Sequence, residues 1–264
     1  KLYLISSIFR DGQIFFRPYG GLFRSALRAF RHIFVQNDSS RNLLKSIGIE
    51  QVSVAGDTRF DRVYEIAQQA KRLPEIERFA ADAPVFIAGS TWPPDEELLV
   101  GLIERYPDVK FIVAPHEIDP ARIEKFCERI SRPALRYTQL TPQSDLAAAG
   151  VLFVDTIGIL SSVYRYGRWG YIGGGFGAGI HNTLEAATFG LPLAFGPRYG
   201  KFREARDLVT LRGAASIASA EELERWFAGL HDDPDATGRS GTICKEYVLQ
   251  HKGATARIMD EICR

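Results

Sequence analysis

The feature that most constrains the fold is a glycine-rich segment at residues 171–197, YIGGGFGAGIHNTLEAATFGLPLAFGP. An apolar run, a glycine-rich loop, a short helix-forming stretch and a second apolar run follow one another, which predicts a βαβ unit. Glycines let a backbone approach a ligand closely. N–H groups at a helix start near His181 and Asn182 favour an anion such as phosphate, and Glu185 is placed to accept from ribose hydroxyls. The same residues also suit an ordinary tight turn.

Apolar stretches alternate with helical patterns through the rest of the chain. The predicted strands cover residues 84–89, 109–114, 151–154, 169–173, 193–195 and 214–217, with helices predicted at 59–78, 221–230 and 236–262. Fully apolar strands joined by helices indicate a parallel sheet that is covered on both faces. We therefore predict an α/β fold with a Rossmann-like parallel sheet flanked by helices.

Polar or glycine-containing segments follow four of the predicted strands. They contain Ser90 and Thr91, then Pro115 and His116, then Ile157 and Gly158, and finally Gly175, Gly177, His181, Asn182 and Glu185. Because ligands bind beyond the carboxyl ends of strands in open parallel sheets, these segments predict one composite nucleotide pocket. Each has a plainer alternative: the hydroxyls as helix caps, the histidines as packed structural groups, and Asp155 as a loop-fixing carboxylate.

Residues 22–34 predict an amphipathic helix near the start of the chain. Apolar side chains share one face, and Arg24, Arg28 and Arg31 share the opposite face. One interpretation is a core-packed helix with a solvated basic face. The other is a basic helix that binds an anionic lipid surface or headgroup.

Composition excludes several classes of function. A net charge of +1 and a pI near 7.9 give no overall case for nucleic acid binding. Three scattered cysteines without CxxC spacing predict free thiols in a reducing compartment. No apolar run reaches the ~18 residues of a membrane helix, and no signal-peptide pattern is present. The only Asp-x-Asp, at 233–235, is interpreted as a solvated turn, so we predict no metal site.

Several motifs resemble the Kdo (3-deoxy-D-manno-octulosonic acid) transferases, glycosyltransferase family 30. The blocks are GIHNTLEAA at 179–187, GLPLAFGP at 190–197 and FREA at 202–205, against a family pattern close to GGHNPLEPA, GKPVLFGP and NFREA. Three segments depart from the family: Trp92 stands for the His of ASTH, Pro115 for the Arg of VPRH, and Ile159 for the Glu of DTMGEL. The resemblance runs through nearly all 264 residues, but it covers only the later part of such an enzyme.

The resemblance implies a GT-B fold of two Rossmann-like domains. Residues 1–58 are then the end of the acceptor domain, and residues 59–264 form the donor-nucleotide-binding domain. It implies metal-independent, inverting transfer of Kdo from CMP-Kdo to a lipid A precursor in lipopolysaccharide biosynthesis. The partners are CMP-Kdo, the lipid A precursor and, through Arg24, Arg28 and Arg31, the membrane surface; no nucleic acid is expected.

The same resemblance places the catalytic base in a preceding domain, so this chain is expected to contain no catalytic residue. It is expected to be a soluble fragment of an enzyme at the cytoplasmic face of the bacterial inner membrane, binding the donor without turning it over. Two alternatives remain open. One is another GT-B sugar-nucleotide enzyme, either a glycosyltransferase or a nucleotide-sugar epimerase. The other is a non-catalytic nucleotide-binding module.

Overall fold

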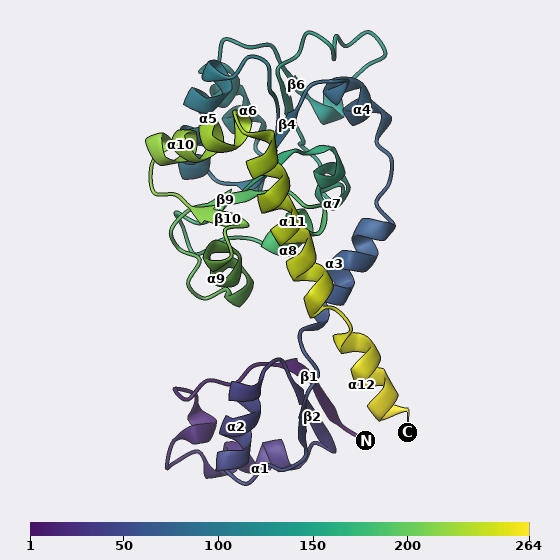
Figure 1. Cartoon of the computed structure of the whole chain (residues 1–264), viewed down its shortest axis with the longest axis vertical. Coiled ribbons are helices and arrows are strands. Elements are labelled where there is room, and N and C mark those ends of the chain that lie inside the picture. The colour runs from purple at the N-terminus through teal and green to yellow at the C-terminus, as the bar shows by residue number, and fades with distance from the viewer. Residues whose placement is uncertain (264) are drawn as a thin grey trace. The chain divides into compact units, whose positions relative to one another are not determined.

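The computed structural model describes residues 1–263, which form two compact units (Figure 1). The smaller unit combines residues 1–65 with residues 249–263, and the larger contains Ile66–Val248. The end of the chain therefore returns to the smaller unit. The assignment of residues 1–58 to an acceptor domain and of 59–264 to a donor domain stays a prediction.

The smaller unit contains a three-stranded parallel sheet in the order β1-β2-β3. Its elements are β1 (Tyr3–Ser7), η1 (Ile14–Phe16), α1 (Gly21–Arg28), β2 (His32–Val35), α2 (Asp38–Ser46), β3 (Val52–Val54) and α12 (Ala254–Ile262). Ile33 and Leu44 lie in one buried cluster, and Ile258 of α12 joins Phe34 in another. Asp61 accepts hydrogen bonds from the backbone N–H groups at the start of α12.

The predicted helix over residues 22–34 is too long. The helix ends at Arg28, and the backbone N–H of Arg31 donates to the carbonyl of Leu2, so the chain has already turned toward the sheet. Arg31 therefore does not share a helix face with Arg24. The apolar face is also only partly packed, because Leu22 is 80% exposed while Leu27 is buried.

The larger unit alternates strands and helices, as the sequence predicts. Two helices, α3 (Thr58–Gln68) and α11 (Pro234–His251), begin in one unit and end in the other. The remaining elements are α4 (Pro74–Ala80), β4 (Val85–Thr91), α5 (Pro93–Arg105), β5 (Lys110–Pro115), α6 (Pro120–Cys127), β6 (Ala134–Arg136), η2 (Tyr137–Gln139), β7 (Val151–Phe153), α7 (Leu160–Val163), η3 (Tyr164–Tyr166), β8 (Trp169–Ile172), α8 (Thr183–Thr188), β9 (Leu193–Phe195), α9 (Arg203–Thr210), β10 (Ala214–Ser216) and α10 (Ala220–His231).

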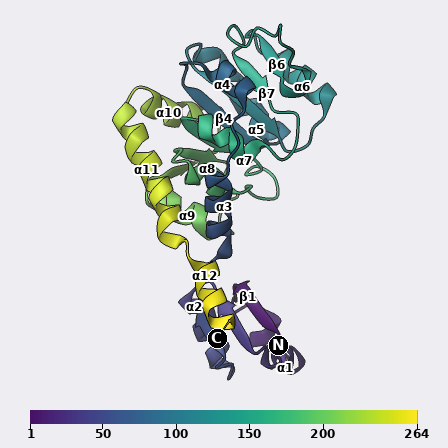
Figure 2. The same ribbon diagram turned by 90° about the vertical axis from the view of Figure 1, so that its right-hand side faces the viewer.

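The seven strands of this unit form one parallel sheet in the order β10-β9-β8-β4-β5-β7-β6. The chain builds outward from β4 to β6 and β7, then crosses back to add β8 on the other side of β4. The topological switch point, where ligands bind in sheets of this kind, thus lies between the ends of β4 and β8. Figure 2 shows β6 and α6 at one side of this unit and α11 at the opposite side.

Both faces of the sheet are covered. In β4, Phe86 and Ala88 point to one face while Val85 and Ile87 alternate with them, and all four are buried. The first face packs against apolar side chains of α5, α6 and α10, which lie close together in Figure 1. This explains why the strands read as continuous apolar runs.

Two predicted helices of this part of the chain are divided in the structure, and one strand was not predicted. Residues 59–78 form two helices, because Pro74 starts α4 and disfavours helical backbone in the residue before it. Residues 236–262 also divide, at Gly253, whose φ of 101° is left-handed. Strand β6 was not predicted, since it has three residues and none is buried. Among the described residues, no helix combines the length and hydropathy required to span a membrane.

Candidate functional site

A buried carboxylate, Asp95, connects the end of β4 to the glycine-rich loop after β8. One oxygen accepts from the hydroxyl of Tyr171 at 2.6 Å. The other accepts from the backbone N–H groups of Gly174 and Trp92, both at 2.9 Å. Asp95 is fully buried in the first turn of α5, so it fixes the loop against the strand on the other side of the switch point.

The loop folds back on itself and packs tightly against its neighbours. The N–H of His181 donates to the carbonyl of Gly173, and Gly177 donates to the carbonyl of Gly174, whose φ is 92°. A Cβ at Gly175 would lie 2.6 Å from the Cα of Gly196 in the turn after β9. At this position glycine serves close packing within the protein, whereas at Gly177 no atom would come nearer than 3.6 Å.

Three aromatic side chains from three elements gather beside this loop. The indole Nε1 of Trp92 donates to Nε2 of His181 at 3.0 Å. The ring of His116 stacks on both, with centroid distances of 4.9 Å to Trp92 and 4.2 Å to His181. Burial and the neighbouring His116 lower the pKa of His181, while Asp95 opposes that shift. His181 is therefore a neutral hydrogen-bonding group near pH 7.

The start of α8 carries the remaining polar groups of the loop segment. The side-chain oxygen of Asn182 accepts from the N–H of Leu184 at 3.1 Å, and its amide donates to one oxygen of Glu185 at 2.9 Å. This arrangement orients Glu185, which is half-buried. Thr183 is buried, and its hydroxyl has no hydrogen-bond partner among the residues described.

Two hydroxyl side chains lie at the end of β4, and one of them already donates a hydrogen bond within the protein. Thr91 is fully buried, and its hydroxyl donates to Glu96, whose pKa is raised by burial. Ser90 is half-buried and adopts a φ of 54°, which is strained for a serine. Pro115 ends the neighbouring β5, and its buried ring precedes the exposed His116.

The segment after β7 is held by a second buried carboxylate. Asp155 accepts from the backbone N–H and hydroxyl of Thr138 and from Nε of Arg136. Burial alone would raise the pKa of Asp155, but these hydrogen bonds outweigh it and lower the pKa. Ile157 follows with 86% of its side chain exposed, and Gly158 has a φ of 87°.

The four predicted segments follow four consecutive strands of the sheet, β8, β4, β5 and β7. Because these strands are parallel, the segments share one edge of the larger unit. Trp92 and Asp95 were not predicted from the sequence to contribute to the site. Asp95 carried one signal, since an acidic residue directly after Pro93 and Pro94 is typical of the first turn of a helix.

The three arginines predicted to contact a membrane lie in the smaller unit, and one of them already binds backbone carbonyls. The guanidinium of Arg24 donates to the carbonyls of Phe15 and Arg17 at 3.0 and 2.9 Å, so it stabilises the turn before α1. Arg28 and Arg31 are exposed. Within the described chain, no cluster of three or more His, Cys, Asp or Glu side chains could hold a metal ion.

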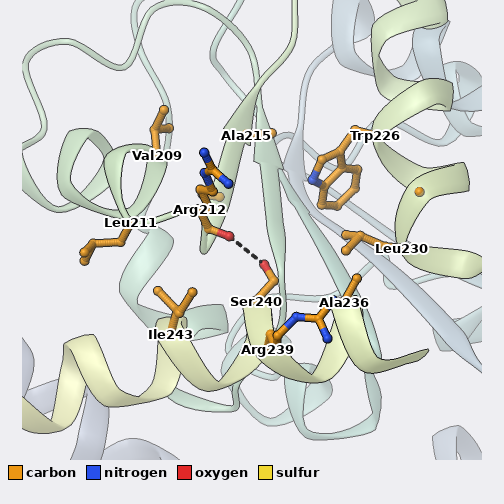
Figure 3. Close-up of a pocket in the computed structure, with 12 residues that line it drawn as sticks. Val209, Leu211, Arg212, Ala215, Trp226, Leu230, Ala236, Arg239, Ser240 and Ile243 are labelled. Carbon is orange, nitrogen blue, oxygen red and sulfur yellow. Dashed lines mark hydrogen bonds between the residues drawn. The ribbon is translucent and has the colours of Figure 1, made fainter. Parts of the chain in front are cut away.

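A pocket of about 600 Å³ lies elsewhere, at the start of the edge strand β10 (Figure 3). Trp226 and Leu230 of α10 and Ile243 of α11 contribute apolar walls. Ser240 donates to the carbonyl of Arg212 there. Because this pocket is at the amino end of its strand, it is separate from the polar edge described above.

Known proteins that are similar in sequence to this chain indicate its family. No family model matches the chain. A 3-deoxy-D-manno-octulosonic acid transferase of Rickettsia bellii is 26% identical over 248 residues, covering 91% of this chain and 58% of the relative. Its counterpart in Chlamydophila psittaci is 22% identical over 253 residues, covering 94% of this chain and 55% of the relative. The resemblance to Kdo transferases is confirmed. The chain spans a little over half the length of these relatives.

Solved structures confirm the GT-B type α/β fold. The C-terminal CMP-Kdo binding domain of WaaA from Acinetobacter baumannii matches with a TM-score of 0.58 and 22% identity, covering 72% of this chain and 99% of that domain. UDP-GlcNAc 2-epimerase from Neisseria meningitidis, bound to UDP-GlcNAc, gives a TM-score of 0.61 at 14% identity, covering 95% and 68%. The fold is thus shared by transferases and epimerases, and it does not separate them.

Proposed function

We propose that this chain is the donor-nucleotide-binding part of a Kdo transferase. In the whole protein, Kdo moves from CMP-Kdo to a hydroxyl of a lipid A precursor during lipopolysaccharide biosynthesis. One observation carries the proposal: the loop segment with His181 and Glu185 lies at the β4/β8 switch point of a chain similar to Kdo transferases over 91% of its length.

The residues at the sheet edge take distinct roles in this proposal. Backbone N–H groups of the loop and the hydroxyl of Ser90 bind the phosphate of CMP. Glu185 accepts from the ribose hydroxyls, and Asn182 holds its carboxylate in place. As CMP leaves, preorganised N–H donors stabilise the charge that gathers on its phosphate. The exposed side chain of Ile157 packs against the base.

The acceptor hydroxyl must lose a proton as it attacks the anomeric carbon, which requires a general base. We place this base outside the present chain, in the part of the relatives that the chain does not cover. Transfer is inverting and independent of metal, with CMP as the leaving group. This chain alone therefore binds the donor without turnover.

Contact with the acceptor membrane is assigned to the smaller unit. Arg28 and Arg31 are exposed, and the nearby Leu22 is 80% exposed. Basic and apolar side chains together bind anionic lipid surfaces, each cation contributing about 1 kcal/mol. Arg24 is left with a structural role because it donates to backbone carbonyls. The whole enzyme then works at the cytoplasmic face of the inner membrane.

A second candidate is an enzyme of a UDP-sugar. It rests on the fold alone, which this chain shares with the epimerase at a TM-score of 0.61 and with the CMP-Kdo binding domain at 0.58. The curated relatives favour the Kdo transferase, because similarity in sequence runs through nearly all of the chain. Nucleotide preference separates the two.

The test is calorimetric titration of this chain with CMP, with UMP and UDP as competitors. We expect selective binding of CMP that is lost in Glu185→Ala. The matched control is Glu246→Ala, which removes an exposed glutamate from α11. Preference for a uridine nucleotide would instead support the second candidate.

A second measurement addresses transfer itself. The whole protein is assayed with CMP-Kdo and a lipid A precursor, with and without Glu185→Ala. Transfer that depends on Glu185 supports the proposal. Selective nucleotide binding by this chain, without any Kdo transfer by the whole protein, would leave a nucleotide-binding module in place of a transferase.

A further inference from the structure

The hydrogen bond between Trp92 and His181 determines where His181 carries its proton. An indole N–H can only donate, so Nε2 of His181 must accept with its lone pair. Since the imidazole is neutral, its one proton is on Nδ1. No described residue accepts a hydrogen bond from that Nδ1.

The two residues are held in register by one carboxylate. Trp92 donates its backbone N–H to Asp95, and Gly174, seven residues before His181, donates to the same oxygen. His181 is further tied to the loop through its own N–H and the carbonyl of Gly173. These hydrogen bonds hold the backbone segments that carry the indole and the imidazole next to each other.

The surroundings disfavour a second proton on His181. His116 stacks on its ring at 4.2 Å from the β5 end. Asp95 in α5 is the anionic group that opposes this effect, and its two oxygens already accept three hydrogen bonds. Among the other charged groups, Glu185 is bound by Asn182, and Arg198 donates to the carbonyl of Gly177.

We propose that Trp92 is a positioning residue that fixes His181 as the Nδ1–H tautomer, so that the imidazole offers a single neutral donor to a phosphate oxygen at the glycine-rich loop. The identity of that ligand rests on the proposed function, whereas the tautomer does not. Without the indole, Nε2 is free to take the proton and Nδ1 becomes an acceptor, which repels a phosphate.

The first test reads the tautomer by proton–nitrogen correlation spectra of the chain labelled at its five histidines. His181→Gln identifies the signals of His181. We expect an unprotonated Nε2 and a protonated Nδ1 in the unmodified chain. Trp92→Phe keeps a ring that stacks on His116 but removes the donor, and it shifts the proton toward Nε2. Trp226→Phe, a half-buried tryptophan on α10, leaves the pattern unchanged.

The second test measures CMP affinity of the same variants. Loss of one neutral hydrogen bond predicts roughly three- to tenfold weaker binding for Trp92→Phe and no change for Trp226→Phe. A protonated Nε2 in the unmodified chain would overturn the inference, as would Trp92→Phe that leaves the proton on Nδ1. A shifted tautomer with unchanged CMP affinity would also overturn the positioning role. If the chain does not bind CMP, the proposed function fails while the spectra still decide the tautomer.

Discussion

Two places along the same edge of the sheet are each organised by a buried aspartate, and the two differ in the groups that donate to the carboxylate. Asp155 after β7 accepts from Thr138 and from the guanidinium of Arg136, with Nε at 2.9 Å. Asp95 beside β4 and β8 accepts only from neutral donors, namely Tyr171 and two backbone N–H groups.

The difference separates a structural connection from a prepared binding surface. At the β7 end, the carboxylate and its cation satisfy each other, and Ile157 and Gly158 are what remains exposed. At the β4/β8 end, the carboxylate is used to hold a loop, and His181 keeps a ring nitrogen uncommitted. Neutral donors around a buried anion fix geometry without placing a competing cation beside the ligand.

The largest expected effect is a contrast between the same substitution at both carboxylates. Asp155→Asn places an amide N–H₂ against an N–H donor in either orientation and removes the anion beside the half-buried Arg136. We expect the free energy of unfolding to fall by about 3 kcal/mol. Asp95→Asn can keep its oxygen toward the two backbone N–H groups and donate to the hydroxyl of Tyr171, so we expect a loss of only about 1 kcal/mol.

Urea unfolding of the two variants measures this contrast. Equal losses would contradict this, because they would show that the charge of Asp95 matters as much as that of Asp155. Asp95→Ala is the reference for losing all three hydrogen bonds, and it should cost more than Asp95→Asn.

The second contrast lies within the loop. Gly175→Ala places a Cβ 2.6 Å from backbone of Gly196, and overpacking of this kind costs about 1–3 kcal/mol. Gly177→Ala meets nothing closer than 3.6 Å, so its effect on stability stays within about 0.5 kcal/mol. Thermal and urea unfolding test the pair. Weaker CMP binding by Gly177→Ala, at unchanged stability, would sharpen the assignment of this part of the loop to the ligand.

The third prediction concerns the apolar end of β7. Ile157→Ser should leave stability unchanged, because Ile157 is 86% exposed. If the base packs there, affinity for CMP falls by roughly three- to tenfold through the lost apolar contact. The control is Leu211→Ser, which changes an exposed leucine next to the edge strand β10. Unchanged affinity in Ile157→Ser would remove this segment from the proposed site.

Most strands of the larger unit, and the edge at which the polar segments meet, could be predicted from the sequence. Strands β4, β5, β7, β8, β9 and β10 were each predicted, because strands covered on both faces read as apolar runs. The glycine-rich loop was predicted from its glycines and from the apolar runs on either side of it. Strand β6 was missed because its three half-buried residues carry no such pattern.

Contacts between distant residues could not be predicted in the same way. Asp95 is 76 residues from Tyr171 and 79 from Gly174, and Trp92 is 89 residues from His181. No local periodicity encodes such pairs. The sequence showed Trp92 only as a departure from a family motif, and the structure shows what that indole contacts.

The smallest expected effect compares two histidines of the larger unit with opposite pKa shifts. A hydrogen bond to Asp232, joined by one to Asp108, raises the pKa of His231, whereas burial lowers that of His181. The stability from His231 is therefore complete below its unfolded pKa of about 6.5 and is lost as pH rises through the folded pKa. For His181 the stability is complete above about 6.5 and is lost as pH falls through the folded pKa. His231→Gln should thus destabilise more at low pH and His181→Gln more at neutral pH, each by less than about 1 kcal/mol. Urea unfolding of both variants at a series of pH values on either side of about 6.5 measures how each loss of unfolding free energy depends on pH. If both variants showed the same sign of pH dependence, folding would raise the pKa of His181, which contradicts a hydrogen bond donated by Trp92 to a neutral imidazole.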